Sequence, residues 1–160
     1  MIVTTKLPMF LLEAQALLVQ SNFGMPRRVV KGFDKNKIEI LCAIIEKKMS
    51  INLGMFDLFV NIPGGIFIKD TSGDLAIAMA MISAIKDIEV SQKIAAIGEI
   101  GLRGEIRKVS FIQKRLTELE KLGFKGVYVP FTNKKEVEKM NYKLKIIYLK
   151  NLTELMERMK

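Results

Sequence analysis

Apolar and polar residues alternate with a period of two in the first part of the chain. This period occurs in residues 11–19 and 56–62. Because successive side chains of a strand point to opposite faces, the period predicts a strand in each segment. Turn residues at 21–26 follow the first segment, and residues 27–31 are expected to return as another strand. Pro63-Gly64-Gly65 follows residues 56–62, and this turn predicts a hairpin whose second arm is residues 66–68.

Two helices are predicted in the same half of the chain. Asp34 is a preferred N-cap residue, and apolar side chains then recur at helical spacing, which predicts a helix over 35–48. A second helix is predicted after Thr71 as its cap. Only Ser83 is polar within residues 75–85, so this helix is apolar all round and is expected to be buried on most sides.

Strands and helices alternate in the second half of the chain. The pattern predicts strands at 94–97, 127–129 and 144–148 and helices that begin after Ser110, Asn133 and Asn151. Each of these three residues is followed three positions later by Gln or Glu, the signature of a capping box. Since strands dominate the first half, the whole order predicts an α/β or α+β domain with a mixed sheet packed by helices.

Composition narrows the chemistry that the chain can perform. Its 160 residues fit one domain, and 49% of them are hydrophobic, which is enough for a core. Without any histidine, neither a Ser-His-Asp triad nor a His-ligated metal site is possible. The single cysteine, Cys42, excludes an internal disulfide and suits a reducing compartment. Its place on an apolar helix face indicates an inert core thiol.

The longest apolar stretch is too short to cross a membrane. It is residues 75–85, bounded by Asp74 and Lys86, whereas a membrane span needs about 18–20 residues. No signal-peptide pattern is visible at the start of the sequence. We therefore expect a cytoplasmic domain without a membrane partner.

The chain is basic, but its charge is unevenly spread. The formal net charge of +9 consists of +4 in the first fifty residues, −3 in the next fifty and +8 in the last sixty. A basic balance favours nucleic acid as a partner, because cations neutralise phosphates. Lysine greatly outnumbers arginine, however, and much of the excess also fits a composition bias or an ordinary solvated surface.

Two short clusters hold the basic residues that we expect to contact DNA or another subunit. They are Arg27, Arg28 and Lys31 in the first cluster, and Arg103, Arg107 and Lys108 in the second. Arg27 and Arg28 are adjacent in a predicted strand and therefore point to opposite faces. One of them is expected to be held by a buried or intersubunit carboxylate.

Two further motifs suggest chemistry. The glycines at 98, 101 and 104 match neither a phosphate loop nor a dinucleotide fingerprint, so they predict a turn between strands. Ser72 lies near Lys69 at the head of the buried helix, where free N–H groups would favour a nucleophile or an anion. A catalytic Ser-Lys pair needs a desolvated lysine from elsewhere, and these near neighbours in a solvated loop favour capping over catalysis.

Several motifs resemble the C-terminal domain of the RadA (Sms) family of bacterial DNA-repair proteins. They occur in the family's order at residues 21–28, 32–36, 57–65 and 74–78, and the resemblance runs from about Leu11 to the C-terminus. More distantly, residues 69–70, 98–104 and 123–130 are similar to the proteolytic domain of Lon. The resemblance implies a two-layer α+β fold of the ribosomal protein S5 domain 2 type, in its Lon proteolytic version.

The resemblance also assigns positions to the Ser-Lys dyad of Lon-type peptidases. The serine position is Gly73 in this chain, and the lysine position is Gln113, which the capping pattern pairs with Ser110. The resemblance therefore implies a domain without peptidase activity. An active peptidase that uses Ser72 and Lys114 is an alternative, which requires a shift of one residue, about 100° of helix rotation, in both elements.

RadA proteins carry a four-cysteine zinc ribbon and a RecA-like ATPase upstream of this domain. By resemblance, residues 1–10 lead in from an ATPase domain and residues 11–160 form the Lon-like domain. ATP, magnesium, zinc and DNA-dependent ATPase or helicase activity are expected only upstream, and no cofactor in this domain. The resemblance implies assembly into a hexameric ring, with DNA and the recombinase machinery as partners. A stand-alone nucleic-acid-binding module of the S5-like superfamily is a further alternative.

Overall fold

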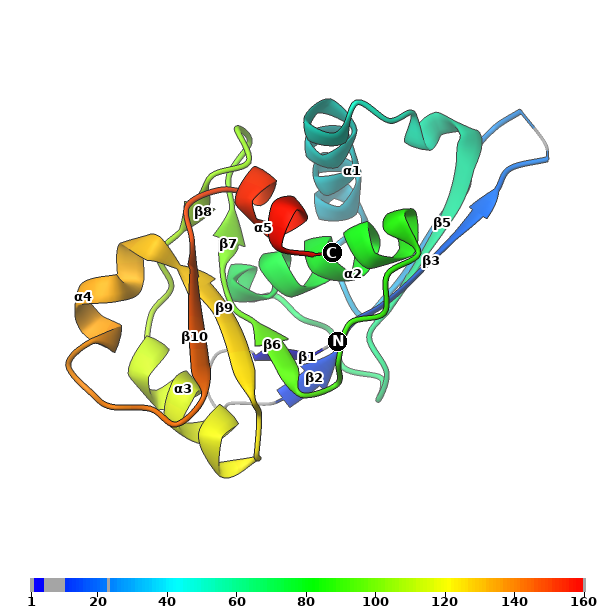
Figure 1. Ribbon diagram of the computed structural model, residues 1–160. Helices are drawn as coiled ribbons and strands as arrows, with labels where there is room; N and C mark the ends of the chain where they lie inside the picture. The colour runs from blue at the N-terminus through cyan, green and yellow to red at the C-terminus, as the bar shows by residue number, and fades with distance from the viewer. Residues whose placement is uncertain (1, 5–10, 23, 160) are drawn as a thin grey trace.

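The computed structural model describes residues 2–4, 11–22 and 24–159. A five-stranded mixed sheet has the order β10-β9-β6-β1-β2 (Figure 1). Its members are β1 (Ile2–Thr4), β2 (Leu11–Glu13), β6 (Ile94–Ala96), β9 (Gly126–Pro130) and β10 (Lys145–Leu149). All neighbours in this sheet are parallel except β1 and β2. As a result, the carboxyl ends of β6, β9 and β10 share one edge.

A second sheet of three strands has the order β3-β5-β4. Its members are β3 (Gln15–Gln20), β4 (Arg28–Lys31) and β5 (Phe56–Asn61), which follows the short helix η1 (Leu53–Met55). The central strand β5 pairs antiparallel with β3 and parallel with β4. A separate two-stranded hairpin joins β7 (Glu99–Ile100) to β8 (Ile106–Arg107).

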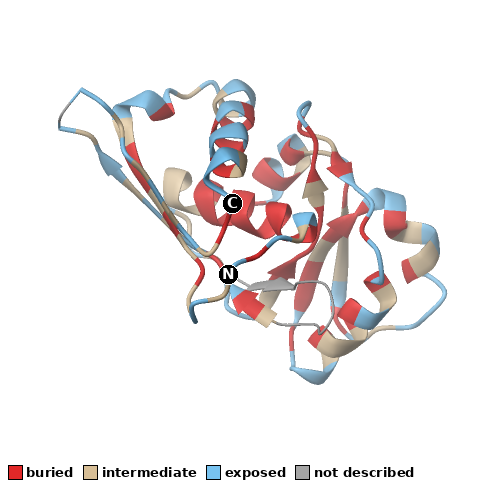
Figure 2. Ribbon diagram, turned by 180° about the vertical axis from the view of Figure 1, so that it is seen from behind, coloured by how far each residue is buried: buried red, intermediate tan, exposed pale blue. Residues whose placement is uncertain are grey.

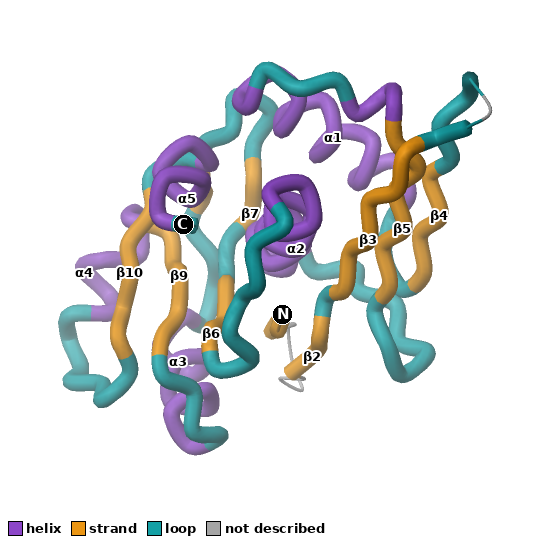
Figure 3. Tube along the Cα trace, turned by 45° about the vertical axis from the view of Figure 1, so that its right-hand side comes forward, coloured by secondary structure: helices purple, strands orange, loops and turns teal. Residues whose placement is uncertain are grey.

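The helix α2 (Asp74–Lys86) runs between the two larger sheets, packing against β3 on one side and β6 on the other (Figure 3). Its residues from Asp74 to Ile82 are all buried (Figure 2). Two other helices, α1 (Lys35–Met49) and α5 (Leu152–Arg158), pack in the same core as α2. The helices α3 (Ile112–Lys121) and α4 (Lys134–Val137) pack on the opposite face of the five-stranded sheet. An apolar helix is stable here because each of its faces meets a packed layer.

The buried side chains fall into two clusters. The larger one surrounds α2 and includes α1, α5 and the three-stranded sheet, and the smaller one lies between the five-stranded sheet and α3. Ala95 and Ala96 of β6 belong to different clusters, because consecutive strand residues face opposite sides. The predicted mixed sheet packed by helices is therefore confirmed.

Several local predictions are confirmed. Asp34 caps α1, since its carboxylate accepts hydrogen bonds from the backbone N–H groups of Asn36 and Lys37. Asn151 caps α5 by accepting from the Glu154 N–H at 3.0 Å. Cys42 is 4% exposed, and burial raises the pKa of its thiol to about 11, which makes it a poor nucleophile.

The predicted hairpin arm at residues 66–68 is wrong, because this segment is not a strand. Both edges of β5 are already occupied, by β3 and by β4, so the chain that follows the turn finds no free edge of β5. It crosses instead to β4, where the Ile68 N–H donates to the Gly32 carbonyl at 2.9 Å.

Three predicted caps are also wrong. Asp70, not Thr71, caps the turn before α2. The residue before α3 is Phe111 in a left-handed conformation (φ 58°), with no side-chain cap, so the pairing of Ser110 with Gln113 does not form a capping box. The Asn133 side chain does not cap α4. Its Oδ1 accepts from the Val109 N–H and its Nδ2 donates to the Val109 carbonyl, both at 3.0 Å.

The predicted boundary at residue 11 falls beside a strand of the same domain. Residues 2–4 form β1, which pairs with β2 and with β6. Residues 1 and 5–10 of the expected lead-in lie outside the described residues. The expectation that an ATPase domain precedes this segment stays a prediction.

Candidate functional site

The head of α2 is where the Lon resemblance places the nucleophile. The short helix η2 (Thr71–Gly73) leads into α2, and the Asp70 carboxylate accepts a hydrogen bond from the Ser72 N–H at 3.0 Å. Gly98 donates its N–H to the Ser72 carbonyl at 2.9 Å and accepts from the Leu75 N–H at 3.0 Å. A Cβ at Gly98 would lie 3.2 Å from the Leu75 side chain. Close packing, rather than phosphate binding, accounts for this glycine.

Gly73 and Gln113 occupy the two positions assigned to the dyad. Gly73 is buried, and its N–H donates to the Asp70 carbonyl at 3.3 Å. Gln113 lies in the first turn of α3, where its side-chain amide donates to the Glu136 carbonyl at 2.7 Å. Glycine offers no nucleophile, and an amide offers no base that could accept a proton at neutral pH.

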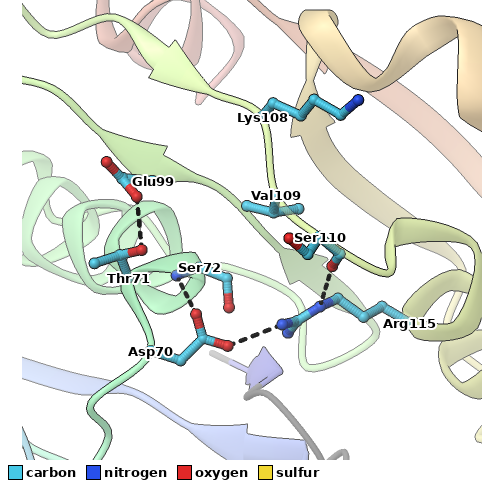
Figure 4. A pocket seen from close by; sticks show the side chains of 8 residues that line it. All are labelled: Asp70, Thr71, Ser72, Glu99, Lys108, Val109, Ser110 and Arg115. Atoms are coloured by element: carbon cyan, nitrogen blue, oxygen red, sulfur yellow. Dashed lines mark hydrogen bonds and ion pairs between the residues drawn. The ribbon is translucent and has the colours of Figure 1, made fainter.

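A cavity of about 200 Å³ opens beside this turn (Figure 4). It is lined by Asp70, Thr71, Ser72, Glu99, Lys108, Val109, Ser110 and Arg115. Arg115 is 2% exposed, and its guanidinium donates to the Asp70 carboxylate at 2.9 Å and to the Ser110 carbonyl at 3.2 Å. Burial raises the pKa of Asp70, but hydrogen bonds from the Ser72 N–H and from Arg115 outweigh it, so the net shift is downward. Asp70 is therefore charged at neutral pH.

Ser72 and Lys114, the alternative dyad, are placed differently. Ser72 is 2% exposed and lines the cavity. Lys114 does not line it; its ammonium lies 5.7 Å from the centroid of the exposed Phe111 ring. The next residue, Arg115, enters the cavity in its place, and a guanidinium stays protonated and cannot act as a base. The structure does not bring the two residues of this dyad together in the cavity.

The chain has known relatives that agree with this architecture. A family model for the Lon protease (S16) C-terminal proteolytic domain matches residues 35–159. The chain belongs to this family. Membership in the family does not by itself establish a Ser-Lys dyad in this chain.

Curated relatives of this Lon-type domain carry the name DNA repair protein RadA. The Aquifex aeolicus protein is 40% identical over 130 residues, which cover 81% of this chain and 29% of the relative. The Campylobacter jejuni protein is 39% identical over 146 residues, 91% of this chain and 31% of the relative. The Escherichia coli K12 protein is 40% identical over 123 residues, which cover 77% of this chain and 27% of the relative. The resemblance to the RadA C-terminal domain is therefore confirmed. The chain spans less than a third of the length of these relatives.

Two further properties bear on cofactors and partners. Within the described residues, no group of three or more His, Cys, Asp or Glu side chains is placed to hold a metal ion. The helices of that same part of the chain are all too short or too polar to cross a membrane.

Asp74, which was evident in the sequence only as the residue before the apolar stretch, forms a buried polar centre at the first residue of α2. The residue is 0% exposed, and its Oδ2 atom accepts from the Lys37 ammonium at 2.8 Å and from the Ile100 N–H at 3.1 Å. Its Oδ1 atom has no hydrogen-bond partner among the described residues. Burial raises the pKa of Asp74 to about 6, although Lys37 opposes the shift. This centre ties α1 and β7 to the head of α2.

The first basic cluster is partly structural. Arg27 donates from its backbone and its guanidinium to Asp57, whose side chain is 5% exposed, with a shortest distance of 2.7 Å. The Asp57 pKa lies below its usual value, chiefly because of the Arg27 backbone hydrogen bond. Arg28 is 10% exposed and donates to the carbonyls of Phe56 and Leu53 at 2.6 and 3.0 Å. Arg27 is thus the arginine held by a buried carboxylate, and Arg28 is committed to the backbone.

Some of the remaining residues predicted to contact DNA or another subunit are ion-paired within the chain, and others are not. Arg107 pairs with Glu105 at 2.6 Å and with Glu99 at 3.5 Å, and Lys108 pairs with Glu136. Lys31 and Arg103 are exposed, and the described carboxylates all lie more than 4 Å from their cationic groups.

The structure keeps the two basic clusters apart. The first lies on β4, at one edge of the three-stranded sheet, and the second on the β7–β8 hairpin, with α2 between them (Figure 3). The two clusters therefore do not form one continuous basic surface on a single copy of the chain.

A third group of cations was missed from the sequence. Lys134 and Lys150 lie over the rings of Phe131 and Tyr148, with the shortest distance, 4.9 Å, between the Lys150 ammonium and the Phe131 centroid. The spacing of each aromatic residue two or three positions before a lysine was visible in the sequence. Only the pairing of β9 with β10 shows that these two short motifs are neighbours.

Proposed function

We propose that the chain is the non-catalytic Lon-like domain of a RadA-type DNA-repair protein, serving as a self-association scaffold and as a DNA-contacting surface in the cytoplasm. The observation that carries the non-catalytic part is the Arg115–Asp70 ion pair in the cavity at the head of α2. A Ser-Lys dyad needs a lysine that loses its proton in a desolvated site. Here the buried cation is a guanidinium with a carboxylate partner at 2.9 Å, which cannot play that role.

The DNA-contacting part is supported by charge and by kinship. The chain carries +9, Arg103 and Lys31 are exposed, and the relatives in several bacteria are called DNA repair proteins. In the complete protein we further expect a hexameric ring, a DNA-dependent ATPase or helicase activity of upstream domains that bind ATP, magnesium and zinc, and cooperation with the recombinase machinery.

Peptidase assays test the non-catalytic proposal. The chain and its Ser72→Ala variant are incubated with casein and with a fluorogenic peptide library. We expect no hydrolysis above the buffer rate for either protein. Hydrolysis by the wild-type chain that disappears in Ser72→Ala would instead establish the alternative Ser72 and Lys114 peptidase.

Light scattering after size-exclusion chromatography and DNA titrations test the other two roles. We expect an oligomer, and DNA affinity that falls with salt. Replacing Lys31 and Arg103 together by Gln should lower the slope of log K against log salt by about 1.4–1.8 units. Lys121→Gln, a change at an exposed lysine paired with Glu118, is the matched control. A strict monomer without DNA affinity at low salt contradicts both roles.

The reading frame upstream of this segment tests the link to a RadA-type protein. A zinc ribbon and a phosphate loop upstream would support it. A stop codon immediately upstream would favour the stand-alone nucleic-acid-binding module.

A further inference from the structure

The outer edge of the five-stranded sheet carries a surface that neither predicted basic cluster includes. We call it the aromatic–basic face and define it by Phe131, Lys134, Lys145, Tyr148, Lys150 and Arg158. β10 is the edge strand of the sheet, and Phe131 follows β9 directly. A cavity of about 450 Å³ runs along β10 from Lys145 to Lys150. At about 3.3 Å per strand residue this groove is about 16 Å long.

The groove combines three kinds of surface. Ile146 and Ile147 form a half-buried apolar part, Phe131 and Tyr148 supply rings at one end, and cations lie along the rim. Phe131 is 42% exposed, and its ring meets Tyr148 edge to face at 6.4 Å between centroids. Phe131 is therefore a partly exposed ring over which the flexible Lys134 and Lys150 side chains lie, and a base that stacks on this ring would displace one of them.

Charge on this face is positive. Lys145, Lys150 and Arg158 line the groove together with one carboxylate, Glu154, which accepts from the Lys150 backbone N–H at 2.9 Å and keeps its charge. Lys134 is paired with Glu138 at 3.5 Å, so the four cations of the face outnumber these two carboxylates. The ammonium groups of Lys134 and Lys150 lie 5.7 and 4.9 Å from the Phe131 centroid, so phosphates and bases could be bound within a few ångströms of each other.

We propose that the aromatic–basic face binds single-stranded nucleic acid, with a base stacked on Phe131 and phosphates on Lys145, Lys150 and Arg158. Rings beside a cationic groove are the usual way in which proteins bind an unpaired strand. In a duplex the base faces are covered by their neighbours, so the rings and the apolar part of the groove would stay unused. An acidic peptide would engage the lysines but would have no planar group for Phe131.

This inference rests on the proposed DNA contact and specifies the strandedness and the surface. The test uses fluorescence anisotropy of the 160-residue chain with a labelled twenty-residue oligothymidine, the matching duplex and an oligoglutamate peptide. We expect preference for the single strand. Phe131→Ala should weaken its binding about 5- to 150-fold, whereas Phe131→Tyr, which keeps a ring, should bind like the wild type. Phe67→Ala is the matched control, because Phe67 is another exposed phenylalanine, 54% exposed, on a distant loop.

A second readout separates stacking from simple loss of folding. An oligonucleotide with 2-aminopurine should lose fluorescence on binding to the wild-type chain and not on binding to Phe131→Ala at saturating concentration. Lys145→Gln together with Lys150→Gln should lower the salt slope by about 1.4 units. Unchanged affinity in Phe131→Ala, equal binding of duplex, or tighter binding of the acidic peptide overturns the inference.

Different binding results would reject the aromatic–basic face and the proposed DNA contact. If the Lys31 and Arg103 changes weaken DNA binding and Phe131→Ala does not, the DNA contact stands and the aromatic–basic face is rejected. If neither DNA form binds at low salt, both are rejected.

Discussion

At the scale of single residues, Asp74 combines complete burial with a carboxylate oxygen that lacks a partner. Its other oxygen is held by Lys37 and by the Ile100 N–H. Burial of a carboxylate disfavours the charged form, and the pKa of Asp74 is accordingly raised to about 6. The folded state thus binds a proton more tightly at this residue than the unfolded chain does.

We therefore expect Asp74 to make stability depend on pH between about 4 and 6. The stability that Asp74 contributes in its protonated form is fully present below the unfolded pKa of 3.8 and is lost as pH rises through about 6. Between these two pH values the folded state binds more protons than the unfolded chain, so stability falls as pH rises. The loss should be about 3 kcal/mol at most. Asp74→Asn should abolish this part of the profile, measured by urea unfolding at several pH values, whereas the exposed Asp87→Asn should not. A profile of Asp74→Asn that parallels the wild type contradicts this.

At the scale of elements, the crossing from β4 to the loop after β5 depends on Gly32. Its φ is 78°, and a Cβ there would lie 2.6 Å from the Ile62 Cβ and 2.7 Å from the Ile66 carbonyl oxygen. This close approach lets the Gly32 carbonyl accept from the Ile68 N–H. The segment after the turn is thereby held against β4 without forming a strand.

Gly32→Ala should destabilise the chain much more than Gly64→Ala. Both glycines have positive φ, 78° and 90°, so both changes should cost about 1–2 kcal/mol of backbone strain. Only Gly32 also meets atoms of the core, which should add about 1–3 kcal/mol, whereas nothing lies within 4 Å of a Cβ at Gly64. Free energies of unfolding from urea titrations measure the difference, and equal losses would refute the steric part.

At the scale of the whole molecule, the Arg115–Asp70 ion pair joins the two core clusters. Arg115 belongs to α3, whose apolar face lies in the smaller cluster, and Asp70 precedes α2, the centre of the larger one. The cavity at the head of α2 thus contains an ion pair that connects the two halves of the core.

Arg115→Gln should therefore destabilise the chain by about 3 kcal/mol, because it leaves a partly buried carboxylate without its cation. Asp70→Asn in the same background should add little, so a double-mutant cycle should show strong coupling. Arg107→Gln, a change at an exposed arginine of a surface pair, should alter stability little. Denaturant unfolding gives all four free energies, and additive losses from Arg115 and Asp70 would show that the pair does not act as a unit.

The sequence by itself determined the elements and much of the core. The periods of two and 3.6, with Asp34 and Asn151 as caps, predicted most of the strands and helices, because these signals are local. The two adjacent arginines of the predicted strand also led us to expect that one of them meets a buried or intersubunit carboxylate, and Arg27 meets the buried Asp57. The motifs further predicted the Lon-type family, which the family match confirms. That Gly73 and Gln113 stand at the two dyad positions stays a prediction.

Tertiary structure alone decided which residues meet. No sequence period shows that both edges of β5 would be paired. Nor does one show that Asn133 would bind the Val109 backbone instead of capping α4. The entry of Arg115 rather than Lys114 into the cavity is equally invisible in the sequence. Each outcome depends on contacts between segments far apart in the chain, where competition for one edge, one donor or one cavity overrides a local preference. The aromatic–basic face arises in the same way, since strand pairing brings Phe131 beside Tyr148 and Lys150.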